Sequence, residues 1–321
     1  LAAGEFDIVH RVTPLSPTSQ SIITARLAKL NIPFVVGPLN GGVPWPSGFI
    51  ERQHAEREWL SHVRRLYKFM PAFQAMRKNS SAIIVGSKFT AEDMPAAVRN
   101  KCVYIPENGI RADQVIDYAQ LTEKLKDINQ RKKLRAIFVG RLVPYKGADM
   151  LLEAAADYLI DGQLELRIVG DGPQRMYLEQ LASKLRVRDA VSFLGSIPHS
   201  EVLTELGRSD VMVFPSIREF GGGVVIESMA MGVPTIVADY AGPAELVDHD
   251  TGIKVPFVDK PSLVAGVKGA LEVVLANRKR LAQLSLAGRE KVLQHYTWEA
   301  KAKKIRHVYA SVLKEHIKPV S

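Results

Sequence analysis

The chain has 321 residues, of which 46% are hydrophobic and 24% are charged, and its formal net charge at pH 7 is +9. This composition excludes a collagen-like or disordered chain, and the length indicates about two globular domains. The single cysteine, Cys102, excludes an internal disulfide and a cysteine-built zinc site, and it fits a reducing cytoplasm.

Short β-branched runs alternate with longer helical stretches, which is typical of parallel sheets covered by helices. Most of the runs are apolar on both faces, as buried parallel strands are. The predicted strands are Asp7–Val12, Phe34–Gly37, Ala82–Gly86, Cys102–Ile105, Arg135–Val139, Glu165–Val169, Ser192–Leu194, Val211–Phe214 and Pro234–Ala238. The predicted helices include Ala148–Leu159, Arg175–Leu185, Ser200–Gly207, Val224–Ala230 and a final helix over Tyr296–Leu313. We therefore expect an α/β protein with doubly wound parallel sheets.

A polar stretch divides the chain. Residues 108–133 are charged, show no strand pattern, and indicate a linker followed by an exposed helix. We place one domain over residues 1–110 and a second over residues 111–297. The first domain has fewer predicted strands and the chain lacks an initial Met, so we expect an N-terminal truncation. Leu1–Gly4 shows no secretory-signal pattern, and no apolar run approaches the ~18 residues of a membrane span.

The first candidate site follows the predicted strand that ends at Gly140. Arg141 and Lys146 lie in the loop between this strand and the next helix. Ligands of open α/β sheets bind outside the carboxyl ends of the strands. A guanidinium and an ammonium there can neutralise a diphosphate leaving group without a metal, although two solvated loop cations are the plainer alternative.

The second candidate site is a glycine-rich turn after the strand Val211–Phe214. Glu219 is followed by Phe220 and three glycines, and Glu227 lies on the next helix. Glycines let backbone N–H groups approach a ligand, and the N-terminus of a helix attracts anions. Carboxylates accept hydrogen bonds from vicinal hydroxyls, which suits a sugar and a ribose.

Two further turns are less specific. Gly170 opens a Gly-Asp-Gly-Pro turn after a strand, but Arg175 occupies the third glycine position of a dinucleotide fingerprint. A ligand contact and a plain turn therefore both stay open for Gly170. Asp248-His249-Asp250 superficially resembles a metal-binding Asp-x-Asp, but Thr251-Gly252 follows, so we expect a turn and no metal site.

Taken together, these motifs resemble the family 4 retaining glycosyltransferases of the GT-B fold. The similarity is strongest over 138–246, and it includes Ala230-Met231-Gly232-Val233-Pro234 and the ending Tyr296-Thr297-Trp298-Glu299. The resemblance implies two Rossmann-like domains facing a cleft, with the first domain incomplete here. It also implies that a C-terminal helix over residues 298–321 returns to the first domain.

The same resemblance implies a role for each site residue. Arg141 and Lys146 would hold the donor diphosphate, Glu219 would contact the transferred sugar, and Glu227 would bind the ribose. Backbone groups would approach the donor at Gly140, Gly170, Gly221 and Gly222. The loop Ser196–Pro198, with Ile197 at its centre, would lie against the base.

Two departures from the family pattern affect these roles. Phe220 directly follows Glu219, where the family usually has Gly or Pro before Phe-Gly, but a subset carries this Arg-Glu-Phe-Gly-Gly version. Asn40 lies nearest the position where many members have a His that contacts the sugar. Retaining transfer can use the leaving phosphate as base, so the reaction does not require that His.

The stretch Glu51–Lys78 is rich in basic residues interleaved with apolar ones. It indicates either a basic amphipathic surface that contacts anionic lipid or a lipid-linked acceptor, or an ordinary solvated helix over a core. The ordinary helix is the more common case. The basic residues are Arg52, Arg57, Arg64, Arg65, Lys68, Arg77 and Lys78.

The sequence therefore predicts a retaining, metal-independent hexosyltransferase in the cytoplasm, with possible peripheral contact at the inner membrane face. Its partners would be a nucleotide diphosphate sugar and a glycan or lipid-linked acceptor, with no cofactor and no nucleic acid. Two alternatives stay open. One is another GT-B enzyme, such as a nucleotide-sugar epimerase or a phosphorylase, and the other is a non-enzymatic polyanion-binding protein suggested by the net charge of +9.

Overall fold

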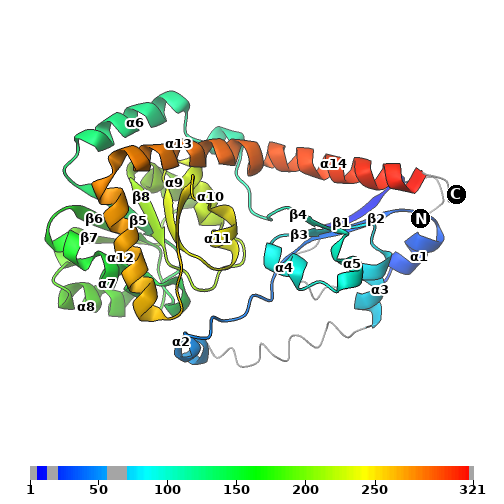
Figure 1. Cartoon of the computed structure of the whole chain (residues 1–321), viewed down its shortest axis with the longest axis horizontal. Helices are drawn as coiled ribbons and strands as arrows, with labels where there is room; N and C mark the ends of the chain where they lie inside the picture. Colours follow the sequence, from blue (N-terminus) through cyan, green and yellow to red (C-terminus); the bar gives the residue numbers. More distant parts are fainter. Residues whose placement is uncertain (1–5, 13–20, 56–70, 318–321) are drawn as a thin grey trace. The chain divides into compact units, whose positions relative to one another are not determined.

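The computed structural model describes residues 6–12, 21–55 and 71–317. The chain divides into two compact units, which we treat separately (Figure 1). The first unit comprises Leu1–Pro44, Gln53–Glu107 and Trp298–Ser321, and the second comprises Trp45–Arg52 and Asn108–Thr297.

The second unit is built on a six-stranded parallel sheet. Its strands are β5 (Leu134–Val139), β6 (Leu164–Val169), β7 (Val191–Gly195), β8 (Val211–Phe214), β9 (Thr235–Ala238) and β10 (Gly252–Val255). Its helices are α6 (Tyr118–Gln130), α7 (Ala148–Ile160), α8 (Arg175–Lys184), α9 (His199–Arg208), α10 (Gly223–Ala230), α11 (Ala241–Leu246), α12 (Lys260–Ala276) and α13 (Arg278–His295).

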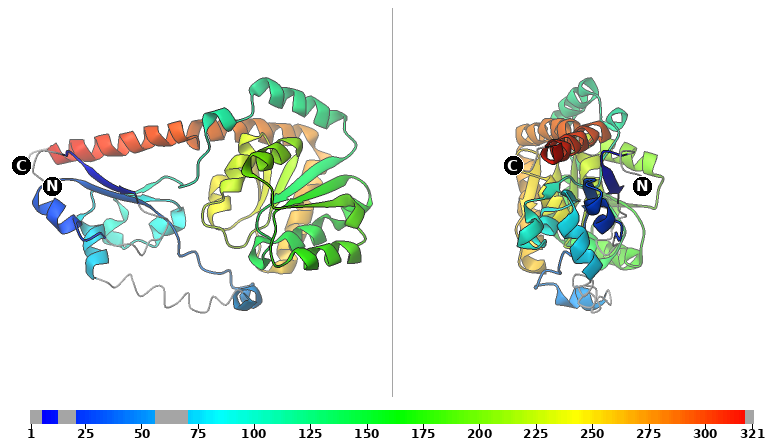
Figure 2. Two further views of the ribbon diagram at one scale, coloured as in Figure 1. Left: turned by 180° about the vertical axis from the view of Figure 1, so that it is seen from behind. Right: turned by 90° about the vertical axis from the view of Figure 1, so that its right-hand side faces the viewer.

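The strand order of this sheet creates a reversal point. The order is β10-β9-β8-β5-β6-β7, so the winding changes direction between β5 and β8. All four residues of β8 are buried, as is expected for an apolar strand in the centre of a parallel sheet. The helices pack in two groups, α7 with α8 and α12, and α10 with α9 and α13 (Figure 2). The second unit is therefore doubly wound.

The first unit contains a four-stranded parallel sheet of order β1-β2-β3-β4. The strands are β1 (Val9–Val12), β2 (Phe34–Leu39), β3 (Ala82–Val85) and β4 (Cys102–Tyr104), and the helices include α1 (Thr24–Lys29), α3 (Pro71–Asn79), α4 (Lys88–Glu92), α5 (Ala96–Arg99) and α14 (Trp298–Ile317). Successive residues of β2 enter different cores, because side chains alternate along a strand. Phe34 packs with Leu27 and Phe73, whereas Val35 packs with Val308 of α14.

Three elements differ from the sequence analysis. Strand β10 was not predicted, because Gly252 and the exposed Lys254 interrupt the apolar run of this edge strand. Helix α6 was expected to be exposed, but one side of it is buried through Leu121, Leu125 and Ile128. The final helix begins at Trp298 rather than at Tyr296, whose burial raises the pKa of its hydroxyl to about 12.

Residues 45–52 were assigned to the first domain by the sequence analysis, but they pack with the second unit. Phe49 is 3% exposed, and its ring centre lies 5.6 Å from that of Phe257. Gly48 forms a parallel bridge with Asp259. The partners of this segment lie far along the chain, so no local pattern could have indicated this packing.

The basic stretch Glu51–Lys78 is described only in part, because residues 56–70 lie outside the described residues. Within the described part, Arg77 is 5% exposed, and its guanidinium carbon lies 4.1 Å from the centre of the Phe73 ring. Arg77 therefore does not belong to an exposed basic surface, which was one of the two alternatives for this stretch. In the ranges that the structure describes, no helix is long and apolar enough to cross a membrane.

Candidate functional site

Three charged residues of the predicted site lie in the two loops at the reversal point of the second sheet. Strands β5 and β8 are neighbours there, with Ala136 opposite Val211 and Ile137 opposite Met212. The loop after β5 carries Arg141 and Lys146, and the loop after β8 carries Glu219. Doubly wound sheets bind ligands at this point, outside the carboxyl ends of the strands.

Lys146 and Glu219 form an ion pair between these two loops. Their side chains are only 15% and 22% exposed. The ammonium of Lys146 also lies 4.9 Å from the centre of the Phe214 ring, at the end of β8. This partly buried position strengthens electrostatic interactions relative to open solvent. The sequence analysis placed both residues at a site but did not predict that they pair.

Backbone contacts join the same two loops. Ile217 N–H donates to the carbonyl of Tyr145 over 2.9 Å, and the hydroxyl of Ser216 donates to that carbonyl over 3.3 Å. Gly147 has a φ of +78°, and a Cβ there would lie 2.5 Å from the carbonyl oxygen of Pro215. Glycine is therefore required where Lys146 leads into α7.

Gly140 and Gly170 have a structural role at the strand ends. Gly170 has a φ of +123°, and a Cβ on it would lie 2.0 Å from the carbonyl oxygen of Gly140. The Gly140 N–H donates to Val169 over 3.0 Å, and the Gly170 N–H donates to Gly195 over 2.8 Å. Close backbone packing accounts for both glycines, and their predicted contact with a ligand stays a prediction.

Helix α10 begins at this site. Gly222 precedes its first turn with a φ of +61°, and as a glycine it has no side chain with which to cap the helix. The first backbone N–H groups of a helix have no partner inside it, and they carry partial positive charge. Gly221 and Gly222 therefore lie where backbone donors suit an anion, in the same loop as Glu219.

Glu227, on α10, contacts a residue that the sequence analysis missed. His199 Nε2 lies 2.9 Å from Glu227 Oε1, and the two side chains are 63% and 23% exposed. His199 begins α9 directly after the Ser196–Pro198 loop, in which Ile197 is half-buried against the core. The position of His199 next to that loop was the only available signal.

The remaining cations differ in their surroundings. Arg141 is exposed, and its side chain forms no hydrogen bond or ion pair within the described part of the chain. The guanidinium carbon of Arg218 lies 5.2 Å from the Trp45 ring and 5.5 Å from the Phe220 ring. Arg141 is therefore the cation of the site that is most open to a ligand.

The Asp248–Asp250 segment forms the expected turn. The Asp248 carboxylate accepts hydrogen bonds from Thr251 over 3.0 Å and from Lys291 over 2.6 Å. Among the residues that the structure describes, no three His, Cys, Asp or Glu side chains are grouped to hold a metal ion.

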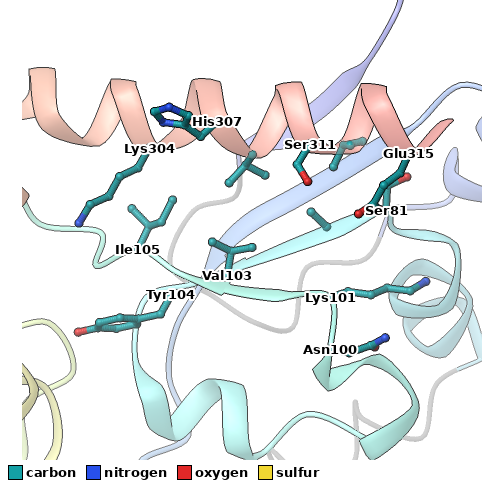
Figure 3. Close-up of a pocket in the computed structure, with 13 residues that line it drawn as sticks. Ser81, Asn100, Lys101, Val103, Tyr104, Ile105, Lys304, His307, Ser311 and Glu315 are labelled. Carbon is teal, nitrogen blue, oxygen red and sulfur yellow. The ribbon is translucent and has the colours of Figure 1, made fainter. Parts of the chain in front are cut away.

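A cavity of about 460 Å³ lies in the first unit, between α14 and the edge strand β4 (Figure 3). Lys304 and His307 from α14, and Val103 and Ile105 from the strand and its end, line this cavity. None of the predicted site residues lies there.

Residues 122–291, more than half of the chain, match the family model of glycosyl transferases group 1. The chain belongs to this family. The matched range contains both loops of the Lys146–Glu219 pair as well as Glu227.

Curated glycosyltransferases are similar to part of this chain. An uncharacterized glycosyltransferase of Methanocaldococcus jannaschii is 35% identical over 181 residues, 54% of this chain and 44% of that protein. The GDP-mannose-dependent alpha-(1-6)-phosphatidylinositol monomannoside mannosyltransferase of Mycobacterium tuberculosis is 32% identical over 231 residues, 68% of this chain and 57% of that protein. The chain spans about half the length of the curated relatives it matches.

Solved structures with a similar fold include Anabaena HepE in complex with UDP. Its TM-score is 0.66 at 18% identity, covering 96% of this chain and 80% of that one. Sucrose-phosphate synthase of Thermosynechococcus elongatus also has a TM-score of 0.66, at 24% identity. The match covers 97% of this chain and 74% of that one. These similarities, with the two parallel sheets, confirm the expected GT-B fold.

Proposed function

We propose that the second unit binds a nucleotide diphosphate sugar, and that the chain takes part in retaining, metal-independent transfer of a hexose to a glycan or lipid-linked acceptor. The observation that carries this proposal is the Lys146–Glu219 pair at the reversal point between β5 and β8. A cation for the leaving group and a carboxylate for the sugar stand side by side there.

The positive groups of the site suit a diphosphate. Lys146, the exposed Arg141 and the N-terminus of α10 are all attached to the two loops that meet there. As the bond between the sugar and the diphosphate breaks, the leaving oxygen takes the electron pair. Positive charge held in place stabilises that developing negative charge. These residues thus supply the stabilisation that a metal gives in other enzymes.

The carboxylates suit the hydroxyl groups of the donor. Glu219 would hold the transferred sugar and Glu227 the ribose, each by accepting hydrogen bonds. The acceptor oxygen forms its bond to the anomeric carbon on the face that the diphosphate leaves, and its proton goes to the leaving phosphate oxygen. This route needs no protein base, which is consistent with Asn40 in place of a His.

The donor class is supported by similar proteins. Anabaena HepE was solved with UDP and with UDP-glucose, and the mycobacterial relative is GDP-mannose-dependent. The bases and sugars differ among these proteins, so we propose the donor class and leave its base to experiment.

Thermal unfolding with a panel of UDP, GDP, ADP and their sugars tests this proposal. We expect one nucleotide family to stabilise the chain by about 2.7 kcal/mol at a ligand concentration of 100 Kd. Glu227→Ala and Arg141→Ala should each reduce the shift. Equal shifts with plain polyanions, lost in high salt, would instead favour a polyanion-binding protein. A nucleotide sugar converted without transfer to any acceptor would favour an epimerase.

His199→Ala is expected to weaken nucleotide affinity about three- to tenfold, because Glu227 loses the hydrogen bond that orients its carboxylate. His199→Gln, which can still donate to Glu227, should retain most of the affinity. Calorimetric titration with the stabilising nucleotide measures both variants. Equal affinity in the wild type and His199→Ala would contradict this role.

A further inference from the structure

The segment Trp45–Arg52, which we call the strap, is tied to the second unit on both sides of Lys146. Arg52 Nη2 lies 2.6 Å from Asp149 Oδ2, and Nη1 donates to the carbonyl of Pro144. The Arg52 and Asp149 side chains are 15% and 4% exposed. The buried Asp149 carboxylate has Arg52 and Lys260 as cationic partners, and the Nζ of Lys260 lies 3.5 Å away. Loss of the Arg52 contact would leave this buried charge only partly compensated, so the contact is costly to lose. Phe49, buried against Phe257, anchors the middle of the strap.

Trp45, at the other end of the strap, contacts both loops of the candidate site. Its ring lies edge-on to that of Tyr145, with centres 6.2 Å apart and an angle of 90°. The guanidinium carbon of Arg218 lies 5.2 Å from the Trp45 ring. Tyr145 is next to Lys146 in the chain, and Arg218 is next to Glu219. One indole ring therefore bridges the immediate neighbours of both members of the ion pair.

We propose that Trp45 is a positioning residue that holds Lys146 and Glu219 in the geometry that receives the donor diphosphate. This inference rests on the proposed function. An edge-on aromatic pair and a cation–π contact each add a modest stabilisation to the two loops that they join. Their combined loss would reduce the fraction of molecules with both loops in place about tenfold. Lys146 and Glu219 would keep their chemistry but lose their fixed placement.

The first test needs no ligand. Hydrogen exchange is compared at the backbone amides of 145–148 and 217–221 in the wild type, Trp45→Ala and Trp45→Phe. We expect Trp45→Ala to speed exchange in both loops, because local opening becomes easier, and Trp45→Phe to restore most of the protection. Tyr177→Ala removes a 46% exposed aromatic ring from α8 and is the matched control. Trp45→Leu, which keeps apolar bulk, replaces Trp45→Ala if that variant does not fold.

The second test separates placement of the diphosphate from overall damage. UDP and UMP, and GDP and GMP, are titrated into the same variants. Trp45→Ala is expected to weaken binding of the diphosphate that binds the wild type about tenfold, and to leave binding of the monophosphate nearly unchanged. A general loss of structure would weaken both nucleotides together.

The outcomes distinguish the two proposals. If Trp45→Ala leaves loop exchange unchanged, or weakens both nucleotides equally, the positioning role is wrong. A third outcome is that the wild type binds no nucleotide although Trp45→Ala loosens both loops. The strap would then hold the loops as described, but the donor-binding function and the role of Trp45 in it would both be wrong.

Discussion

Replacing Lys146 with alanine is expected to lower the rate of sugar transfer about 100-fold or more, because a fixed charge that stabilises the leaving diphosphate is removed. Glu219 would also lose its partner and stand as an unpaired carboxylate facing an anion. Release of nucleoside diphosphate from the donor, measured with an acceptor present, gives the rate. Lys184→Ala, at an exposed lysine of α8 in the same unit, is the matched control.

The pair of Lys146 and Glu219 can be examined with a double-mutant cycle. Lys146→Met, Glu219→Gln and the double variant are compared by their affinity for the nucleoside diphosphate. If the two residues act together, the double variant loses less affinity than the sum of the single losses. Strict additivity, or an undiminished rate in Lys146→Ala, would contradict the assigned role of the pair.

Gly170→Val is expected to destabilise the chain by about 4 kcal/mol or more, which is a large effect for one substitution. The new Cβ would lie 2.0 Å from the carbonyl oxygen of Gly140, and the φ of +123° is unfavourable for a side chain. For a unit of this size, we expect the melting temperature to fall by about 10 °C or more. Thermal unfolding followed by circular dichroism measures the shift.

Two other glycines separate the causes of this effect. Gly162 has a φ of +67° but nothing within 4 Å of an added Cβ, so Gly162→Ala shows the cost of backbone strain alone. Gly269 has space and lies in α12, so Gly269→Ala should stabilise the chain by about 0.5–1 kcal/mol. A Gly170→Val variant as stable as Gly162→Ala would show that the close approach to Gly140 is not as tight as the structure indicates.

Much of the fold could be predicted because the central strands carry their own signal. Strands β5 and β8 are largely apolar runs followed by glycine or proline, and β6 alternates apolar with charged residues before Gly170. Both patterns are typical of strands. Strand β10 was not predicted, because an edge strand can expose a charged residue such as Lys254 to solvent, and this residue interrupts the apolar pattern. Residues 45–52 were misassigned because chain continuity suggested the first domain, whereas burial of Phe49 placed them with the second unit.

The candidate site was predictable in its members but not in its contacts. Arg141, Lys146 and Glu219 follow strand ends, and parallel strands bring all their carboxyl ends to one edge of a sheet. The pairing of Lys146 with Glu219, 73 residues apart, depends on β5 lying beside β8, which is a property of the strand order. The contact of His199 with Glu227 depends likewise on α9 packing against α10.

The α/β class, the parallel strands and the loops that carry the charged residues could be predicted from the amino-acid pattern, because apolar periodicity and glycine placement act over short distances. The folded chain was needed to show which of these loops meet, that Arg77 is buried, and that Trp45 and Arg52 belong to the second unit. These outcomes arise from packing between segments distant along the chain. Burial and charge pairing determine which of many possible partners each segment contacts, and no local sequence pattern indicates these contacts.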